Sequence, residues 1–294
     1  MKTKPKVQLV LSAGGARGMA HIGVIEQLEQ DGFEIVEIIG CSMGAVVGGL
    51  YAGGHLPAYK EWLLSLQRGD VFRQMDFTLT TRGFLKGEKV FQTMLEMTGA
   101  CNIEDLRIPF RAVACDLENG EEVVFDRGDL MEALRASIAI PGIFTPFNHQ
   151  GRYLIDGGVI NPLPVNLLKQ REDALVIAVN INSPGPPPAA LLKNEAKPAH
   201  NWLNINWPIF KKDEKISPDQ NLFSILGLSY EHMQNRLIDL TSGLNPPDLL
   251  VNVKRSSCGM FDFHKAQELI TAGELAYREA KALKEKEQNY LPQG

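Results

Sequence analysis

The stretch EIVEIIGCSMGAVVGGLYA, residues 34–52, joins an apolar run to a glycine-rich turn and then to a run of small residues. Residues 34–39 are rich in isoleucine and valine, as buried strands are, and a helix is expected from Ala45 to about Ala52. The turn between them, GCSMG, matches the G-x-S-x-G pattern of a nucleophile elbow, in which a serine projects from a tight strand-to-helix turn. Ser42 is therefore a candidate nucleophile, although an ordinary glycine-rich turn with a buried serine would carry the same letters.

Glycines stand two residues either side of this serine. They suit an elbow because a Cβ at either position would collide across the turn. The helix that follows would aim the positive end of its dipole at the serine and favour negative charge developing there. Gly40 and Gly44 are therefore the predicted elbow residues.

A second strand–turn–helix unit comes earlier in the chain. Residues 6–12, KVQLVLS, are typical of a short buried strand, and a helix is expected from about Arg17 to Gln30. Two such units in succession favour a parallel sheet with crossover helices, and hence an α/β fold. Further strands are predicted at 108–115, 121–125, 152–156, 174–180 and 248–253, and further helices at 88–98, at 129–139, after Pro162 and Pro164, at 221–240 and at about 262–287. We expect one domain over residues 1–294, with an irregular insertion containing prolines and tryptophans at about 182–220.

The turn of the earlier unit, GGARG, is a glycine-rich loop at a helix start. Its successive backbone N–H groups would form a nest able to hold the oxyanion of a tetrahedral intermediate. Such loops also bind phosphates and dinucleotides, and Glu34 lies where a ribose-binding acid would be expected. The loop spells neither G-x-G-x-x-G nor G-x-x-x-x-G-K-[ST], and the elbow on the next unit favours the oxyanion hole. The predicted oxyanion-hole residues are Gly14, Gly15, Ala16, Arg17 and Gly18.

A serine hydroxyl needs a positioned base, most often a histidine. Asp156 ends the strand RYLID at a Gly-Gly turn that would hold its carboxylate in place, although a turn-capping aspartate would suit the same position. The order Ser…Asp…His would need one of the last three histidines, and none follows a recognisable buried strand. A surface or structural role is favoured for all six, which are His21, His55, His149, His200, His232 and His264.

The composition is that of a soluble globular protein. The chain has 294 residues, 44% hydrophobic and 22% charged, with a net charge of −5 that gives no general attraction for nucleic acid. The cysteines are widely spaced and lack metal-ligand spacing, so a reduced, cytoplasm-like compartment is expected. They are Cys41, Cys101, Cys115 and Cys258.

Two segments resemble export or membrane signals. Residues 1–16 have a basic start and a short apolar run, but Gln8 interrupts that run and a glycine-rich turn follows it. The uncharged stretch 38–59 is long enough to span a membrane, yet it contains six glycines. A strand, a turn and a small-residue helix explain these letters better, so neither signal is accepted.

In order and spacing, GGARG at 14–18, GCSMG at 40–44 and the Asp-Gly-Gly turn at 156–158 resemble the motifs of the patatin-like phospholipases. Residues 136–142, ASIAIPG, also match a stretch common in bacterial members of that family. The resemblance runs from about Val7 to Asn180, and the tail from about Pro246 to Gly273 is similar too.

This resemblance implies a three-layer α/β/α fold with a mainly parallel central sheet. It also implies a Ser–Asp dyad without a catalytic histidine, and hydrolysis of acyl esters in phospholipids or lysophospholipids without a metal or cofactor. By that match Ser42 is the nucleophile, Asp156 is the general base, and the loop at 14–16 is the oxyanion hole. Many members have a third glycine where this chain has Ala13, which leaves the following N–H donors available. Two alternatives remain at this point: a Ser-His-Asp esterase or acyltransferase, and a nucleotide-binding regulatory module without turnover.

The insertion combines Trp202 and Trp207 with Lys211 and Lys212. Aromatic side chains in the lipid boundary and lysines near head groups would give a membrane contact through 202–212. A loop that packs its aromatics onto the domain would explain the same composition. We expect a cytoplasmic protein with a lipid substrate and no nucleic-acid partner, and the peripheral membrane contact through 202–212 stays one of two interpretations of the insertion.

Overall fold

The computed structural model describes residues 4–67, 69–71, 76–80, 83–85, 87–169, 171–186, 222–255 and 262–290. The strands are β1 (Lys6–Leu11), β2 (Glu34–Cys41), β3 (Phe77–Thr80), β4 (Gly83–Leu85), β5 (Phe110–Asp116), β6 (Glu122–Phe125), β7 (Phe147–His149), β8 (Arg152–Asp156), β9 (Ala174–Ser183) and β10 (Leu249–Lys254). The α-helices are α1 (Ala20–Gln30), α2 (Met43–Gly53), α3 (Leu56–Ser65), α5 (Glu88–Thr98), α6 (Leu130–Ser137), α8 (Leu222–Leu244) and α9 (Ala266–Tyr290). Short 3₁₀ turns are η1 (Gly15–Met19), η2 (Ile103–Asp105), η3 (Gly157–Val159), η4 (Val165–Leu167) and η6 (Phe263–Lys265).

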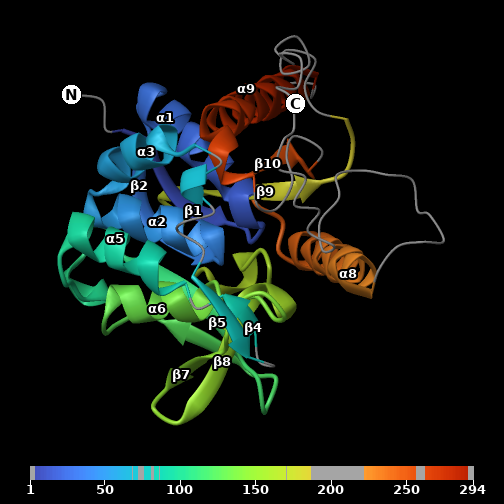
Figure 1. The fold of residues 1–294 in the computed structure, drawn as a ribbon. Helices are drawn as coiled ribbons and strands as arrows, with labels where there is room; N and C mark the ends of the chain where they lie inside the picture. Colours follow the sequence, from blue (N-terminus) through green and yellow to red (C-terminus); the bar gives the residue numbers. More distant parts are fainter. Residues whose placement is uncertain are drawn as a thin grey trace.

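Within these ranges, eight strands form one sheet in the order β10-β9-β1-β2-β5-β8-β7, with β6 paired to β5 (Figure 1). The strands from β10 to β5 run parallel, whereas β6, β7 and β8 form antiparallel pairs. Parallel neighbours need crossover connections, and α1 provides the one between β1 and β2. The predicted α/β class with a mainly parallel sheet is confirmed.

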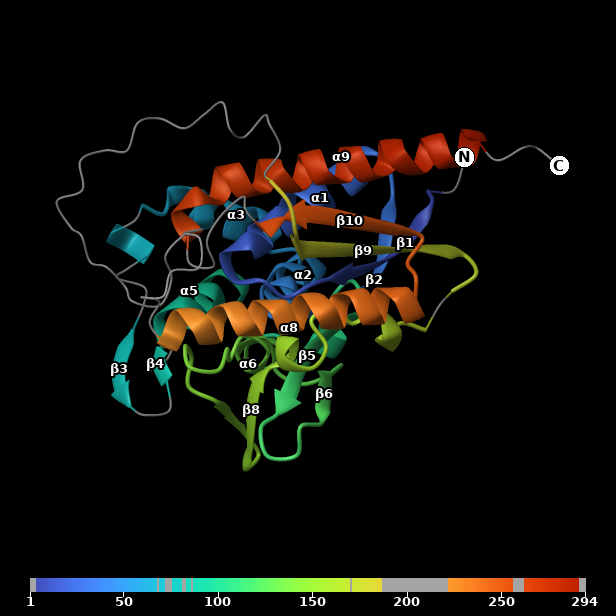
Figure 2. The ribbon, with the colours of Figure 1, turned by 90° about the vertical axis from the view of Figure 1, so that its right-hand side faces the viewer.

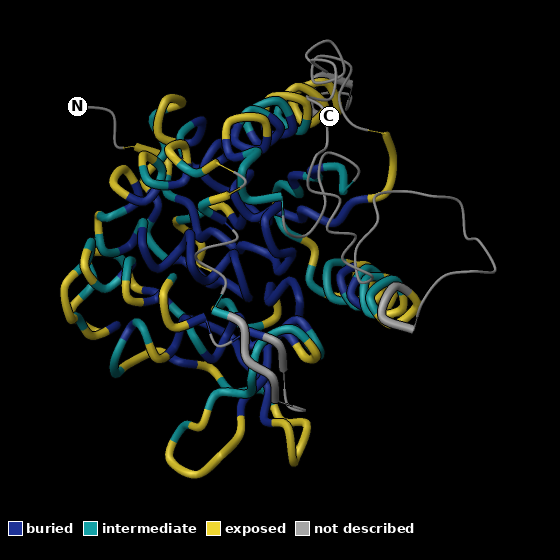
Figure 3. The backbone as a smooth tube through the Cα atoms, viewed as in Figure 1, coloured by how far each residue is buried: buried dark blue, intermediate teal, exposed yellow. Residues whose placement is uncertain are grey.

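The central strands are buried on both faces, which explains their nearly unbroken apolar sequences. Leu9 and Leu11 of β1 belong to the core shared with α1, α2 and α9. Val10 points the other way, into a cluster with Val176 of β9 and Ile238 of α8. Figure 2 shows α9 and α8 on opposite sides of β9 and β10, and Figure 3 shows the buried positions concentrated between the helices. Helices therefore cover both faces of this part of the sheet.

The hydrophobic patterns of the sequence predicted several helices and strands with the correct bounds. The helix predicted over 88–98 coincides with α5, and the strand predicted over 152–156 coincides with β8. The helix predicted after Pro162 and Pro164 is wrong, because that segment forms only the 3₁₀ turn η4. Leu163 and Val165 pack into the cluster beneath the sheet, and the two prolines restrict the residues that precede them to extended conformations. The helix α3, the hairpin of β3 and β4 and the strand β7 were not predicted.

The predicted insertion begins later than residue 182. β9 continues to Ser183, which pairs with Lys254 of β10. Residues 187–221, including the predicted membrane contact at 202–212, lie outside the described residues. The interpretation of the chain as one domain stays a prediction.

The uncharged stretch at 38–59 is divided between β2, α2 and the start of α3. None of the helices in the described ranges combines the length and the apolar character needed to cross a membrane.

Candidate active site

Ser42 lies between the last residue of β2 and the first residue of α2. Its backbone has a φ of 54° and a ψ of −125°, a conformation that is costly for a residue with a Cβ and that recurs at functional turns. Both flanking glycines are required: a Cβ on Gly40 would come within 2.5 Å of Cα of Ala45, and one on Gly44 would collide with the Leu11 carbonyl. Close packing of α2 against the sheet thus fixes the direction in which the serine projects.

The hydroxyl of Ser42 donates a hydrogen bond to Asp156, with 2.5 Å between Oγ and Oδ2. The two residues come from β2 and β8, which both pair with β5. Cys41, next to the serine, pairs with Val113 of β5. Asp156 pairs with Ala114, the next residue of the same strand. Ser42 and Asp156 are only 2% and 1% exposed, so the pair is shielded from bulk water.

Burial is the main influence on the Asp156 carboxyl, and it raises the pKa to about 6. Hydrogen bonds from Ser42, Gly158 and Cys41 act in the opposite direction. The Gly158 N–H lies 2.7 Å from Oδ1, and the Cys41 Sγ lies 3.9 Å from the same oxygen. A carboxylate with a pKa near 6 is ionised at neutral pH and can still accept a proton readily, as a general base must.

Ser137, at the end of α6, forms hydrogen bonds that hold the backbone of the elbow. Its Oγ accepts the backbone N–H of Ser42 at 2.8 Å and donates its own proton to the Val113 carbonyl at 2.6 Å. Ser137 is fully buried. The sequence analysis assigned no role to this residue, although it belongs to the stretch ASIAIPG at 136–142 whose resemblance to family members was noted.

The glycine-rich loop forms the 3₁₀ turn η1, whose residues are all buried. The first N–H groups of a helical turn have no partner within it and can bind an external acceptor. Two carbonyls of the loop are already engaged: the Ala13 oxygen accepts from Asn182 Nδ2 at 2.6 Å, and the Gly14 oxygen accepts from Arg17 Nε at 3.3 Å. Of the five predicted oxyanion-hole residues, Gly15 lines the same cavity as Ser42.

The other predicted loop residues lie around this position. Arg17 is buried and forms an ion pair with Glu231 of α8, at 2.9 Å between Nη2 and Oε1. Gly18 packs against the Met43 side chain, and Ala16 belongs to the main core.

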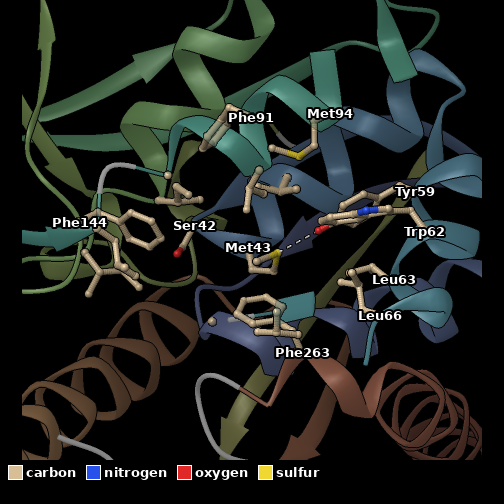
Figure 4. Close-up of a pocket in the computed structure, with 18 of the residues that line it drawn as sticks. Ser42, Met43, Tyr59, Trp62, Leu63, Leu66, Phe91, Met94, Phe144 and Phe263 are labelled. Carbon is tan, nitrogen blue, oxygen red and sulfur yellow. Dashed lines mark hydrogen bonds between the residues drawn. The ribbon is translucent and has the colours of Figure 1, made fainter. Parts of the chain in front are cut away.

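An apolar cavity of about 910 Å³, its mouth included, borders Ser42. In Figure 4, Ser42 and Phe144 lie toward one side of the cavity, while Tyr59, Trp62 and Leu63 of α3 lie toward the other. Phe91 and Met94 of α5 and Met43 of α2 also line it.

One acidic residue, Asp76, is among the described residues that line the cavity. Its two carboxylate oxygens accept the backbone N–H groups of Gly87 and Glu88, at 2.6 and 2.8 Å. The carboxylate therefore satisfies N–H groups at the start of α5, and the rest of the described lining is overwhelmingly apolar.

Histidines take no part in the hydrogen bonds that Ser42 and Asp156 make within the described residues. His21 is buried, its Nε2 lies 3.0 Å from the Ser12 carbonyl, and burial lowers its pKa to about 4. His149 lies 3.4 Å from Glu132 and packs edge-on against Phe125. His232 is exposed on α8, while His200 lies outside the described residues. His55 and His264 are partly buried.

The mixed sheet, the strained serine elbow and the carboxylate beside it define an α/β protein of the patatin-like class. A profile of the family described as patatin-like phospholipase matches residues 9–169, which include the glycine-rich loop, the elbow and Asp156. The chain belongs to the patatin-like phospholipase family.

Among individual proteins, the chain is similar to an uncharacterized NTE family protein of Mycobacterium tuberculosis (strain ATCC 25618 / H37Rv). The identity is 34% over 327 aligned residues, covering 92% of this chain and 90% of that protein. The lysophospholipase NTE1 of Candida albicans is 31% identical over 188 residues, which cover 60% of this chain and 13% of that protein. Among solved structures, VipD from Legionella pneumophila aligns with a TM-score of 0.41 and 15% identity, covering 81% of this chain and 67% of that chain.

Proposed function

We propose that this protein is a serine acyl hydrolase that cleaves acyl ester bonds of lipids, either phospholipids or lysophospholipids. Ser42 is the nucleophile, Asp156 is the general base, and the loop at 14–18 supplies the oxyanion hole. The observation that carries this proposal is the 2.5 Å hydrogen bond between the two side chains beside an apolar cavity. Family membership and the relatives named as lysophospholipases add support.

In the acylation step, Asp156 Oδ2 takes the Ser42 proton while Oγ attacks the ester carbonyl carbon. The electron pair of the carbonyl bond moves to its oxygen, and backbone N–H groups around Gly15 stabilise the resulting oxyanion. When the tetrahedral intermediate collapses, the bond to the alcohol oxygen breaks. That alcohol or lysolipid leaves with the proton returned from Asp156, and the acyl group remains on Ser42.

Deacylation repeats these steps with water as the nucleophile. Asp156 removes a proton from the water, the hydroxyl oxygen attacks the acyl-enzyme, and the loop again binds the oxyanion. Ser42 recovers its proton from Asp156 as the fatty acid departs. The raised pKa of Asp156, about 6, suits a group that must accept and return a proton in each half-reaction.

The apolar lining of the cavity supports a lipid substrate. A fatty acyl chain can lie against Met43, Phe91 and Trp62, because transfer of methylene groups from water to an apolar surface is favourable by about 0.8 kcal/mol each. A phosphate or dinucleotide would find few polar partners there, which disfavours the nucleotide-binding alternative. The Ser-His-Asp alternative lacks a histidine partner for Ser42 among the described residues.

The decisive test combines a covalent probe with turnover measurements. A fluorophosphonate should label Ser42, and p-nitrophenyl esters of increasing acyl length should be hydrolysed faster as the chain fills the cavity. Ser42→Ala should abolish labelling and turnover, and Asp156→Asn should abolish turnover, while both variants keep the wild-type circular dichroism spectrum. Defined phospholipids and lysophospholipids would then identify the head-group class. A folded Asp156→Asn variant with near-full activity would refute the dyad.

A further inference from the structure

We propose that Glu231, on helix α8, is a positioning residue that holds the oxyanion loop in its working orientation through Arg17. This inference rests on the proposed acyl hydrolase function. α8 lies on the face of the sheet opposite α9 (Figure 2), and nearly 190 positions of sequence separate Glu231 from Ser42. It nevertheless contacts both the loop and the turn that follows Asp156.

The guanidinium of Arg17 connects the helix to the loop. Its Nη2 lies 2.9 Å from Oε1 of Glu231, and its Nε donates to the Gly14 carbonyl at 3.3 Å. The Arg17 side chain is 4% exposed and that of Glu231 is 21% exposed. Because a guanidinium is planar and rigid, fixing one edge on the carboxylate also fixes the N–H that reaches the loop.

Peptide geometry converts this contact into an orientation of the candidate oxyanion donor. The Gly14 carbonyl and the Gly15 N–H belong to one planar trans peptide, in which the two groups point in opposite directions. Arg17 holds the carbonyl on its own side. The Gly15 N–H is thereby turned the other way, and Gly15 is the loop residue that borders the cavity with Ser42.

Residues next to Glu231 on α8 also contact the turn that follows Asp156. Gln234, 3% exposed, donates from Nε2 to the Gly158 carbonyl at 3.2 Å, and the N–H of Gly158 is a donor to Asp156. The Tyr230 hydroxyl is buried on the same stretch of α8. It lies near Asp156, since burial first and that carboxylate second raise the pKa of the phenol. α8 therefore bridges the oxyanion loop and the base.

The ion pair also determines what Arg17 would do if Glu231 were removed. Its charge is buried and already paired. Removal of Glu231 would leave that cation buried and unpaired, and the favourable response is for the guanidinium to move toward water. The Gly14 carbonyl would then lose its donor, and the Gly15 N–H would lose its fixed direction.

The test compares Glu231→Gln, Glu231→Ala and Glu231→Asp with the wild type, and uses Asp239→Asn as the matched control. Asp239 is an exposed acid two turns further along the same helix. The measurements are the fluorophosphonate labelling rate of Ser42, kcat and KM on a p-nitrophenyl ester normalised to titrated serine, and the melting temperature. Glu231→Gln preserves the shape of the side chain and serves if the alanine variant does not fold.

We expect labelling and kcat to fall by about tenfold or more in Glu231→Gln and Glu231→Ala, with KM within about twofold, because the interaction matters in the oxyanion state. Glu231→Asp should recover part of the loss, and Asp239→Asn should match the wild type. A purely structural role would lower the melting temperature and leave kcat per titrated serine unchanged, and that result overturns the inference. Absence of labelling in the wild type would instead refute the proposed function itself.

Discussion

Asp156→Asn should make the protein more stable at neutral pH while abolishing its turnover. The carboxyl is buried, its pKa is raised to about 6 from an ordinary 3.8, and burial is the largest cause. Above pH 6 the folded protein must therefore keep an ionised group in an unfavourable environment, whereas the unfolded chain exposes that group to water. The asparagine has nearly the same shape: its oxygen can accept from Gly158, and its amide can donate to Ser42.

The size of the effect follows from the two pKa values. A difference of about two in pKa corresponds to about 3 kcal/mol, at 1.36 kcal/mol for each unit. Because the folded-state pKa is the higher one, the stability contributed by protonated Asp156 is complete below pH 4 and is lost as the pH rises through 6. The stabilisation by Asp156→Asn should thus reach about 3 kcal/mol at pH 8, raise the melting temperature by roughly 5–10 °C, and vanish near pH 4.

Urea unfolding of the wild type and the variant at several pH values would measure this difference. Asp116→Asn is an informative control because the effect should have the opposite sign. That carboxyl accepts the N–H groups of Asn119 and Glu118 and pairs with Arg152, and these contacts lower its pKa. Equal or lower stability of Asp156→Asn at every pH would show that Asp156 does not carry the predicted burial cost.

Three further predictions concern the same site. In the wild type, kcat/KM should fall about tenfold for each pH unit below 6, since only the ionised form of Asp156 accepts the serine proton; a profile that stays flat down to pH 4 would contradict this base. Ser137→Ala should lower the free energy of unfolding by about 1–3 kcal/mol in urea titrations, because the Ser42 N–H loses its acceptor, and an unchanged midpoint would mean that water replaces it. Met94→Trp should shift the acyl-length optimum toward shorter p-nitrophenyl esters by filling the cavity, with little effect on the acetate ester; an unaltered optimum would exclude this region as the acyl site.

Much of the site could be predicted from the sequence, because each of its motifs is formed by residues close together in the chain. The elbow needs glycines at two fixed spacings from Ser42, and the steric conflict that imposes them is present in the structure as well. Asp156 was selected as the end of a strand at a glycine turn, and the structure brings it to 2.5 Å from the serine oxygen. Both residues were predicted from sequence neighbours only a few positions away.

What escaped prediction depends on distant parts of the chain. The extension of β9 to Ser183 runs through polar residues, which are tolerated because Asn180 pairs with Asn252 and Asn182 donates to the Ala13 carbonyl. The contacts of Ser137 and Glu231 with the site likewise join segments far apart in sequence. A single sequence contains the donors and acceptors but not their pairing.

Strand β5 contributes no reacting group, yet its pairing with β2 and β8 sets the relative positions of the two residues that react. β2 runs parallel to β5 and ends where Cys41 pairs with Val113, and β8 runs antiparallel to β5 and ends where Asp156 pairs with Ala114. The two strand ends therefore lie beside adjacent residues of β5. A slip of one position in either pairing would shift the nucleophile relative to its base by about 3.3 Å, more than the 2.5 Å that separates the two oxygens. Regain of turnover during refolding should therefore report the docking of this strand, and partly folded chains that contain both residues should be inert.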